Sequence, residues 1–406
     1  MLAIPADADA LDDLAGIIKR VKMSPDFQVL FSDVEDGVLK LDIRYHEEKY
    51  RAEVYPMEFQ LPQLYRCQHT FPDVDVDRLE CASAGLAVEM VFGPDPLDSY
   101  HLQLKLCYAL LPDILAVIDD SSEKILSGHW VALAAVSMVP PAPRYIFTAQ
   151  AVAGEDGTVW LHTHGLNRCG LTELEILNST KETYQEHYNV METMAKRMLE
   201  TEEPLEPGEP LYLARLSEDK VLVATLIPWK RALKYYGEEI LGGQSDRQDG
   251  HNGNTSAIFV YPSRDDYENG NYAPLSIYDD ILAQNPIYLF SLAETERMKA
   301  LASERVAYLF RGLSNDENHA LVKLGLTIDE EYRTEDNNKE HIWFELLGRD
   351  GNQLNVKLTQ EPYYIKGLHE GDIGTYPLSD LTDWIIYTPD GSITPDDVYI
   401  MDLEAL

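Results

Sequence analysis

The chain has 406 residues, of which 45% are hydrophobic and 25% charged, a composition typical of two or three globular domains with cores of their own. Its 70 acidic and 33 basic residues give a net charge of −37, which disfavours nucleic acid and anionic membranes as partners and favours a basic protein. Its four cysteines stand apart, no apolar run reaches the ~20 residues of a membrane-spanning helix, and no secretion signal opens the chain, so we expect a cytoplasmic protein.

Residues 1–203 have the pattern of a two-layer α/β domain. An amphipathic helix at 9–21 precedes two strands of alternating polarity at 38–45 and 50–55, which a polar turn joins into a hairpin. The spacing of apolar and turn residues then predicts helices at 73–84, 99–111 and 128–137, strands at 86–92 and 114–118, a hairpin at 145–152 and 158–163, a strand at 174–177, and a helix that Ser179 caps and that runs to 198.

Two further regions follow an acidic, Pro-rich linker at 202–210. Residues 204–312 are predicted to form a second α/β region, with strands at 211–215, 220–226, 257–261 and 287–290, helices at 229–237 and 293–309, and a mobile loop at 242–254. Residues 313–406 have short strands at close spacing, which favours a small β-barrel-like domain. We therefore expect an α/β (α+β) protein with mixed sheets and a barrel-like C-terminal domain. That last region carries 20 acidic and six basic residues, which is consistent with an interaction surface.

The last region contains an aromatic strand, His341-Ile-Trp-Phe-Glu345, a turn, Gly367-Leu-His-Glu-Gly-Asp372, and a strand entry, Pro377-Leu-Ser-Asp-Leu-Thr-Asp-Trp384. These stretches resemble domain-of-unknown-function family 2314, whose members show an aromatic strand, an L-x-x-G-D turn and a P-L-x-x-I-x-D-W entry. The chain departs from that family after this entry, where a Gly-rich turn ending in Tyr-Thr is common and Thr394-Pro-Asp-Asp-Val-Tyr399 stands instead.

Three earlier stretches, Ser99-Tyr-His-Leu-Gln-Leu104, Asp119-Asp-Ser-Ser122 and residues 160–176, resemble domain-of-unknown-function family 4026. The two resemblances imply the arrangement of the fold and a bacterial cytoplasmic setting, and they imply no activity. More distantly, Thr163-His-Gly-Leu166 with the following Glu173-Leu-Glu175 is similar to families found among immunity proteins of bacterial toxin systems.

The most specific candidate site is His162-Thr-His164 with the residues that follow it. Residues two apart on a strand share a face, so His162 and His164 are predicted to lie together, and so are Glu173 and Glu175 on the next strand. Imidazoles beside carboxylates can bind zinc or another divalent metal, or transfer protons, and Arg168 in the intervening loop can hold an anion with two hydrogen bonds. The alternative is structural: the histidines satisfy a polar strand face, and Arg168 pairs with one of the glutamates.

A second candidate site consists of Asp119 and Asp120 with His129. The two acids follow a buried strand, at the end where open α/β sheets bind ligands, although such a segment is also typical of a loop that enters a helix. The last region also has a dense group of aromatic residues, typical of a peptide-binding groove or, more often, of a small core. These residues are Trp343, Phe344, Tyr363, Tyr364, Trp384 and Tyr387.

Two functions remain open on the sequence alone. The first is a binding protein without catalysis, immunity-like in one form, that engages a basic partner; the acidity and the absence of Walker, G-x-G-x-x-G, G-x-S-x-G and H-E-x-x-H motifs favour it. The second is a metal-dependent hydrolase that uses His162, His164 and Glu173 or Glu175. We favour the first, which needs no cofactor and makes the protein a non-enzyme, although the acidity is also explained by solubility alone.

Overall fold

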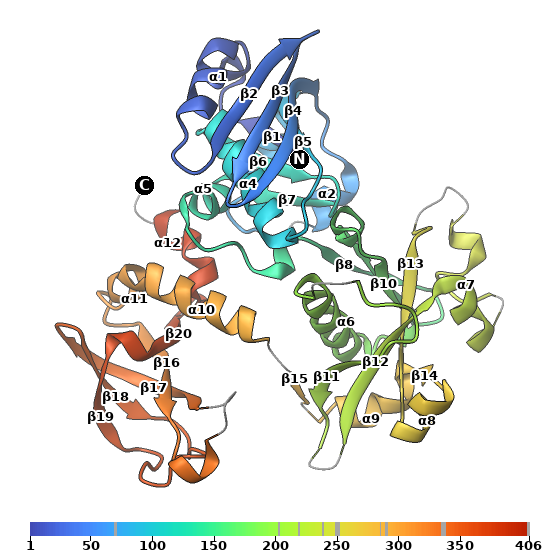
Figure 1. Ribbon diagram of the computed structural model, residues 1–406, viewed down its shortest axis with the longest axis vertical. Helices are drawn as coiled ribbons and strands as arrows, with labels where there is room; N and C mark the ends of the chain where they lie inside the picture. The colour runs from blue at the N-terminus through green and yellow to red at the C-terminus, as the bar shows by residue number, and fades with distance from the viewer. Residues whose placement is uncertain are drawn as a thin grey trace. The chain divides into compact units, whose positions relative to one another are not determined.

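The computed structural model describes residues 1–68, 71–201, 204–217, 220–237, 239–247, 252–284, 286–288, 291–333 and 338–403. They form two compact units, the first of Met1–Val136 and Pro141–Ser291, the second of Ser137–Pro140 and Leu292–Leu406. Each unit combines helices with sheets, which confirms the predicted class (Figure 1). None of the described helices is both long enough and apolar enough to cross a bilayer.

The first unit begins with a seven-stranded sheet. Its strands are β1 (Leu2–Pro5), β2 (Gln28–Glu35), β3 (Val38–Tyr45), β4 (Glu48–Glu58), β5 (Ala84–Met90), β6 (Ile114–Asp119) and β7 (Lys124–Ser127). Their order is β2-β3-β4-β5-β1-β6-β7, and every neighbouring pair is antiparallel. The predicted β3–β4 hairpin is confirmed, and alternate residues of β3 (Leu39, Leu41 and Ile43) are buried as its polarity pattern requires.

Helices cover this sheet. They are α1 (Leu14–Met23), α2 (Gln63–Gln68), α3 (Val76–Cys81), α4 (Pro96–Leu110) and α5 (Gly128–Val136), with a 3-10 turn η1 (Ala8–Leu11) before α1 and another, η2 (Pro143–Tyr145), after α5. Helix α4 contacts both α1 and α5 and is buried on nearly all sides. The helix predicted over 73–84 was too long, because α3 ends at Cys81, Ala82 has an extended backbone and Ala84 already pairs in β5.

A second sheet follows in the same unit. Its strands are β8 (Thr148–Ala153), β9 (Thr158–His164), β10 (Glu173–Thr180), β11 (Leu211–Arg215), β12 (Val221–Pro228), β13 (Thr255–Val260), β14 (Ala273–Pro274) and β15 (Ile287–Tyr288). The order is β15-β11-β12-β13-β10-β9-β8, with β14 beside β13. Only β10 and β13 pair in parallel among these described strands. Strands on both sides of the predicted linker share this sheet, and the predicted strand end at 289–290 lies outside the described residues.

The helices of this part are short apart from one. They are α6 (Tyr184–Leu199), α7 (Trp229–Ala232), α8 (Arg264–Asn269) and α9 (Asp279–Leu282), with 3-10 turns η3 (Leu166–Cys169), η4 (Leu233–Tyr235), η5 (Gln244–Arg247) and η6 (Leu275–Tyr278). Helix α6 packs on β8, β9, β10 and β11. The prediction that Ser179 caps α6 was wrong: Ser179 lies in β10, and the residue before the helix is Thr183.

The second unit is a six-stranded antiparallel sheet with helices on it. The strands are β16 (His319–Thr327), β17 (Lys339–Asp350), β18 (Gln353–Leu358), β19 (Ile373–Pro377), β20 (Leu381–Thr388) and β21 (Gly391–Ile393), in the order β19-β18-β17-β16-β20-β21. The helical segments are α10 (Leu292–Glu304), α11 (Val306–Gly312), η7 (Glu330–Tyr332), η8 (Leu378–Asp380), η9 (Pro395–Asp397) and α12 (Tyr399–Leu403).

The described strands of the second unit form an open sheet, so the expected barrel does not close. Strands β19 and β21 stand at opposite ends of the order and are not paired with each other among the described residues. Helix α10 packs on β20, where the indole of Trp384 donates a hydrogen bond to the carbonyl of Ala302 at 3.0 Å. Burial between sheet and helix therefore takes the place of burial inside a closed barrel.

Candidate functional site

The two histidines of the primary candidate lie on the same side of strand β9, as their spacing predicts. The ring centroids of His162 and His164 are 4.9 Å apart, and the ring of Trp160, two residues earlier, lies 4.2 Å from that of His162. Glu175 on β10 is paired directly opposite His162. His162 is buried, whereas Nδ1 of His164 lies 3.7 Å from a carboxylate oxygen of Glu123 near the surface. The period of the strand therefore gives the correct common face, but the two rings have different surroundings.

Glu175 is held inside the protein by an ion pair that the sequence does not indicate. Its carboxylate accepts a hydrogen bond from the indole of Trp160 at 3.2 Å and another from the guanidinium of Arg247. Arg247 lies between the rings of Trp160 and Trp229 and also donates to the carbonyl groups of Gly242 and Asn252. Burial raises the pKa of Glu175, while the charge of Arg247 opposes that rise.

Arg247 belongs to the segment that we predicted to be a mobile loop. Its hydrogen bonds fix residues 242–247 and 252 to the buried carboxylate of Glu175. Residues 248–251 of that segment lie outside the described residues, so the mobility of the loop stays a prediction. No pattern in the sequence distinguishes Arg247 from the other polar residues around it, because its partner is 72 positions away.

Glu173 has a structural task in the turn between β9 and β10. One of its oxygens accepts hydrogen bonds from the backbone N–H groups of Gly165 and Asn167, both at 2.9 Å, and the other accepts from the hydroxyl of Thr163 at 2.7 Å. Burial raises the pKa of Glu173, and these hydrogen bonds act in the opposite direction. The carboxylate therefore stabilises the left-handed turn at Gly165, where φ is 114°.

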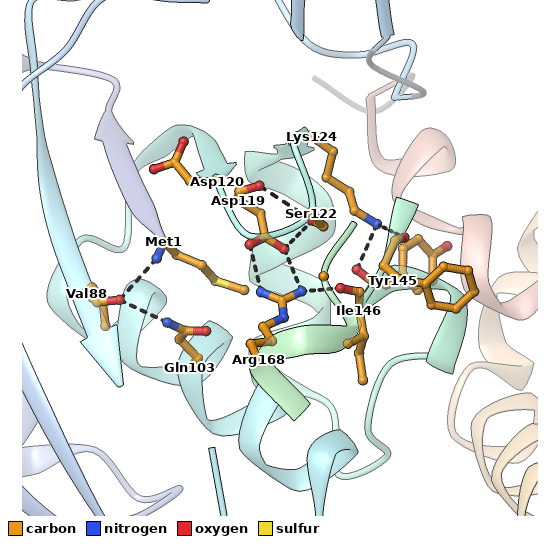
Figure 2. A network of polar contacts seen from close by, with 12 residues as sticks. Met1, Val88, Gln103, Asp119, Asp120, Ser122, Lys124, Tyr145, Ile146 and Arg168 are labelled. Atoms are coloured by element: carbon orange, nitrogen blue, oxygen red, sulfur yellow. Dashed lines mark hydrogen bonds and ion pairs between the residues drawn. The ribbon is translucent and has the colours of Figure 1, made fainter. Parts of the chain in front are cut away.

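Arg168 pairs with Asp119 rather than with either glutamate, which joins the two candidate sites. Its two terminal nitrogens donate to the two carboxylate oxygens of Asp119 at 2.7 and 2.9 Å, and it also donates to the carbonyl of Ile146 (Figure 2). The hydroxyl of Ser122 donates to the same carboxylate at 2.6 Å. Burial alone would raise the pKa of Asp119, but Arg168 and Ser122 hold it below its ordinary value.

The guanidinium of this pair lies over two aromatic rings. The guanidinium carbon of Arg168 lies 5.1 Å from the ring centroid of Tyr100 on α4 and 5.4 Å from that of Phe92. Asp119 is 1% exposed and closes strand β6. The bond therefore ties the end of the first sheet to the turn that follows β9 in the second sheet, and it is a buried, bidentate ion pair.

Three of the five primary candidate residues line one polar cavity. The cavity has a volume of about 380 Å³ and lies beside the turn after β9. Its walls are formed by Ser121, His164, Gly165, Asn167, Arg168, Glu173, Asn252, Gly253 and Asn254. His162 and Glu175 are not among them, so the predicted cluster of five is divided between this cavity and the interior.

A second cavity adjoins the same segment. It has a volume of about 400 Å³ and shares Gly253 and Asn254 with the polar cavity. Its wall is more apolar and includes Leu171, Met198 and Trp229. The two cavities show that the Asn252–Ser256 stretch lies between spaces of different polarity.

The members of the second candidate site do not form one cluster. Asp119 is committed to Arg168, whereas Asp120 is exposed and its carboxylate accepts a long hydrogen bond of 3.5 Å from the hydroxyl of Tyr65. His129 contacts a different acid, Asp73, at 3.3 Å. The three residues therefore have three different partners, and a joint function for Asp119, Asp120 and His129 stays a prediction.

Sequence reasoning missed Lys124, which lies next to the Arg168–Asp119 pair. Its ammonium group donates to the carbonyl oxygens of Tyr145 and Phe147 at 2.9 and 2.6 Å (Figure 2). Burial lowers the pKa of Lys124 to about 7, against the pull of Asp119. A lysine just after a segment typical of a helix-entry loop gives no sign of this environment in the sequence.

A serine, a histidine and an aspartate also form a chain of hydrogen bonds that was not predicted. The hydroxyl of Ser179 is 2.8 Å from Nδ1 of His187, and Nε2 of His187 is 2.9 Å from the carboxylate of Asp279. This order resembles a hydrolase triad. Ser179 is fully buried, however, so no substrate carbonyl can reach its oxygen, and the arrangement fastens α6 to β10 and α9.

The ligand set that a metal site needs is not assembled in the described part of the chain. Within those residues no group of three or more His, Cys, Asp or Glu side chains is placed to hold a metal ion. His162 and His164 are close, but Glu175 is engaged by Arg247 and Glu173 by the turn. The donors around these histidines thus do not fit a closed zinc or other divalent-metal site of the usual kind.

Fold and site together describe a mixed α+β protein with a polar cavity, in whose wall Arg168 and Glu173 are engaged by other groups of the protein. Residues 1–141 match the N-terminal model of a protein family of unknown function, DUF4026, and residues 149–259 match its C-terminal model. Residues 295–394 match DUF2314, an uncharacterized protein conserved in bacteria. The first unit therefore belongs to DUF4026 and the second carries a DUF2314 domain, as both resemblances indicated. No curated protein and no solved structure matches the chain.

Proposed function

We propose that the chain is a non-catalytic binding protein whose partner is basic. The observation that carries this proposal is the state of the candidate site: Asp119, Arg168, Glu173 and Glu175 are all engaged by groups of the protein itself. A general base needs a free proton-accepting atom that faces the substrate. A nucleophile needs a free electron pair in the same position. The cavity offers mainly neutral hydrogen-bonding groups, which suit recognition better than chemistry.

The net charge of −37 supports a basic partner. An acidic protein raises the local concentration of a cationic one and speeds their encounter. An inhibitor of a cationic toxin, as an immunity protein is, would be one concrete form of this function. The free thiols of Cys81, Cys107 and Cys169 agree with action in the reducing cytoplasm. The metal-dependent hydrolase lacks such support, because the described histidines and glutamates do not assemble the ligands of a metal site.

Affinity capture tests this function. The purified chain is immobilised beside an unrelated protein of equal net charge, and both are exposed to lysate of the source organism from 50 to 500 mM NaCl. We expect a basic protein that the chain retains at low salt and the control does not, and that leaves as the salt rises. Recovery of no such protein at 50 mM NaCl would contradict the proposal.

A further inference from the structure

The aromatic residues of the second unit include a core group and a surface group. Phe344 and Trp384 are fully buried. Tyr363 and Tyr364, by contrast, expose 79% and 43% of their surface, and Tyr332 exposes 38%. The rings of Tyr332 and Tyr364 are 5.6 Å apart, and those of Tyr363 and Tyr364 are 6.3 Å apart. We call these three exposed tyrosines the tyrosine patch.

The backbone under the tyrosine patch is held in place by carboxylates. The two oxygens of Glu340 accept hydrogen bonds from the N–H groups of Tyr363 at 2.7 Å and Tyr364 at 2.9 Å. The N–H of Asp329 donates to the carbonyl of Tyr364 at 3.0 Å, and its side chain accepts from the N–H of Lys366 at 2.9 Å. Exposed aromatic rings on an ordered loop lose little entropy when a partner binds, which is typical of binding anchors.

One ring of the tyrosine patch, that of Tyr332, already carries a cation of the chain itself, and an acidic side chain pairs with that cation. Glu331 immediately precedes Tyr332, and its carboxylate pairs with the ammonium group of Lys366. That ammonium nitrogen lies 5.4 Å from the ring centroid of Tyr332, within the range of a cation–π contact. Lys366 and Glu331 are both more than half exposed, so a cation from another molecule can reach the same place.

We propose that the tyrosine patch is the docking surface for a cationic segment of a protein partner. A lysine or arginine side chain of that segment would lie on the tyrosine rings beside Glu331, in the position that Lys366 shows to be suitable for a cation. The excess of acidic over basic residues in 313–406 supplies the complementary charge. This inference rests on the proposed function, and it names the surface that the basic partner contacts.

The first test removes two of the three rings, those of Tyr363 and Tyr364, without changing the charge. Binding of an (Arg-Lys)4 octapeptide is measured by calorimetry at 150 mM NaCl for wild type, for Tyr363→Ala/Tyr364→Ala and for Tyr267→Ala, which alters an exposed tyrosine of the first unit. We expect the double variant to bind about fivefold more weakly and Tyr267→Ala to bind as wild type does. Tyr363→Phe, which keeps the ring, should retain the affinity.

The result separates the docking surface from the proposed function. If the double variant binds the peptide with wild-type affinity, the tyrosine patch is not the docking surface, whereas the proposed binding function is unaffected. If the wild-type chain binds neither the peptide nor any basic protein in the capture experiment, both the docking surface and the proposed function are contradicted.

The second test removes the cation that occupies the patch. Lys366→Ala and Lys357→Ala each add one unit of negative charge, but Lys357 lies on β18 and approaches Glu345 only at 3.9 Å. We expect Lys366→Ala to bind the octapeptide about threefold more tightly than Lys357→Ala, because it frees the ring of Tyr332 and Glu331. Equal affinities of the two variants would show that Lys366 does not occupy the docking position and would overturn the proposal.

Discussion

At the scale of single residues, the Arg168–Asp119 pair is expected to contribute strongly to the free energy of unfolding. Asp119→Asn leaves a buried guanidinium without its counter-charge, so we expect the free energy of unfolding to fall by about 3 kcal/mol. Asp42→Asn is the matched control, because the Arg51–Asp42 pair is exposed, and we expect a change of about 0–1 kcal/mol there. Urea denaturation measures both. Equal losses in the two variants would show that the buried pair contributes no more than a surface contact.

Gly165, in the turn between β9 and β10, has a backbone conformation that favours glycine. Its φ is 114°, and a Cβ placed there would lie 2.6 Å from the carbonyl oxygen of Ile146. Gly37 also has a positive φ, of 84°, but a Cβ there meets nothing within 4 Å. We expect Gly37→Ala to cost about 1–2 kcal/mol of unfolding free energy from the backbone alone and Gly165→Ala to cost clearly more. Thermal denaturation of the two variants compares them, and a smaller loss for Gly165→Ala would be inconsistent with the close approach.

Residue spacing predicted some of the candidate site and could not predict the rest. That His162 and His164 share a face follows from the two-residue period of a strand, which is a local property. The partners of Arg168 and Glu175 are set by tertiary packing, since Asp119 is 49 and Arg247 72 positions away. A single sequence contains no local signal for such pairs.

At the scale of elements, helix α6 depends on a buried histidine. Burial lowers the pKa of His187 below 6.5, although Asp279 and Glu186 act in the opposite direction. The folded state thus favours the neutral ring, so its stabilisation is complete above pH 6.5 and decreases as the pH falls toward the lowered pKa. We expect the stability measured by urea denaturation to decline between pH 7 and 5, and His187→Gln to reduce that slope. An unchanged slope in the variant would assign the decline to other groups.

Elements with strong local patterns were predicted well. The β3–β4 hairpin and strand β6 agree with their predicted positions to within a few residues, because alternation and apolar runs report burial directly. The start of α6 was misplaced because Ser179 has the right type and spacing for a cap but uses its hydroxyl on His187. The barrel failed for a related reason, since closure depends on which strands meet and not on how short they are.

At the scale of the whole molecule, the excess of 37 negative charges opposes folding. Like charges are brought closer in the compact state, and salt screens their repulsion over a Debye length of ~8–10 Å near physiological ionic strength. We expect the midpoint of thermal unfolding to rise as NaCl increases from 10 to 300 mM and then to level off. Sucrose at equal osmolality is the control for effects other than screening. A midpoint that is flat or falls over this range would contradict self-repulsion as a main destabilising term.

The buried bond between Asp119 and Arg168 also links the two segments of the DUF4026 family. Asp119 belongs to the segment 1–141 and Arg168 to the segment 149–259, so each half, made alone, would leave an ionised group without its partner. We expect each half, synthesised alone, to be unstable, and the two halves to reassemble when they are co-expressed. A split of the gene near residue 145 would thus provide a complementation pair, and the carboxylate–guanidinium contact would help to hold the two fragments together.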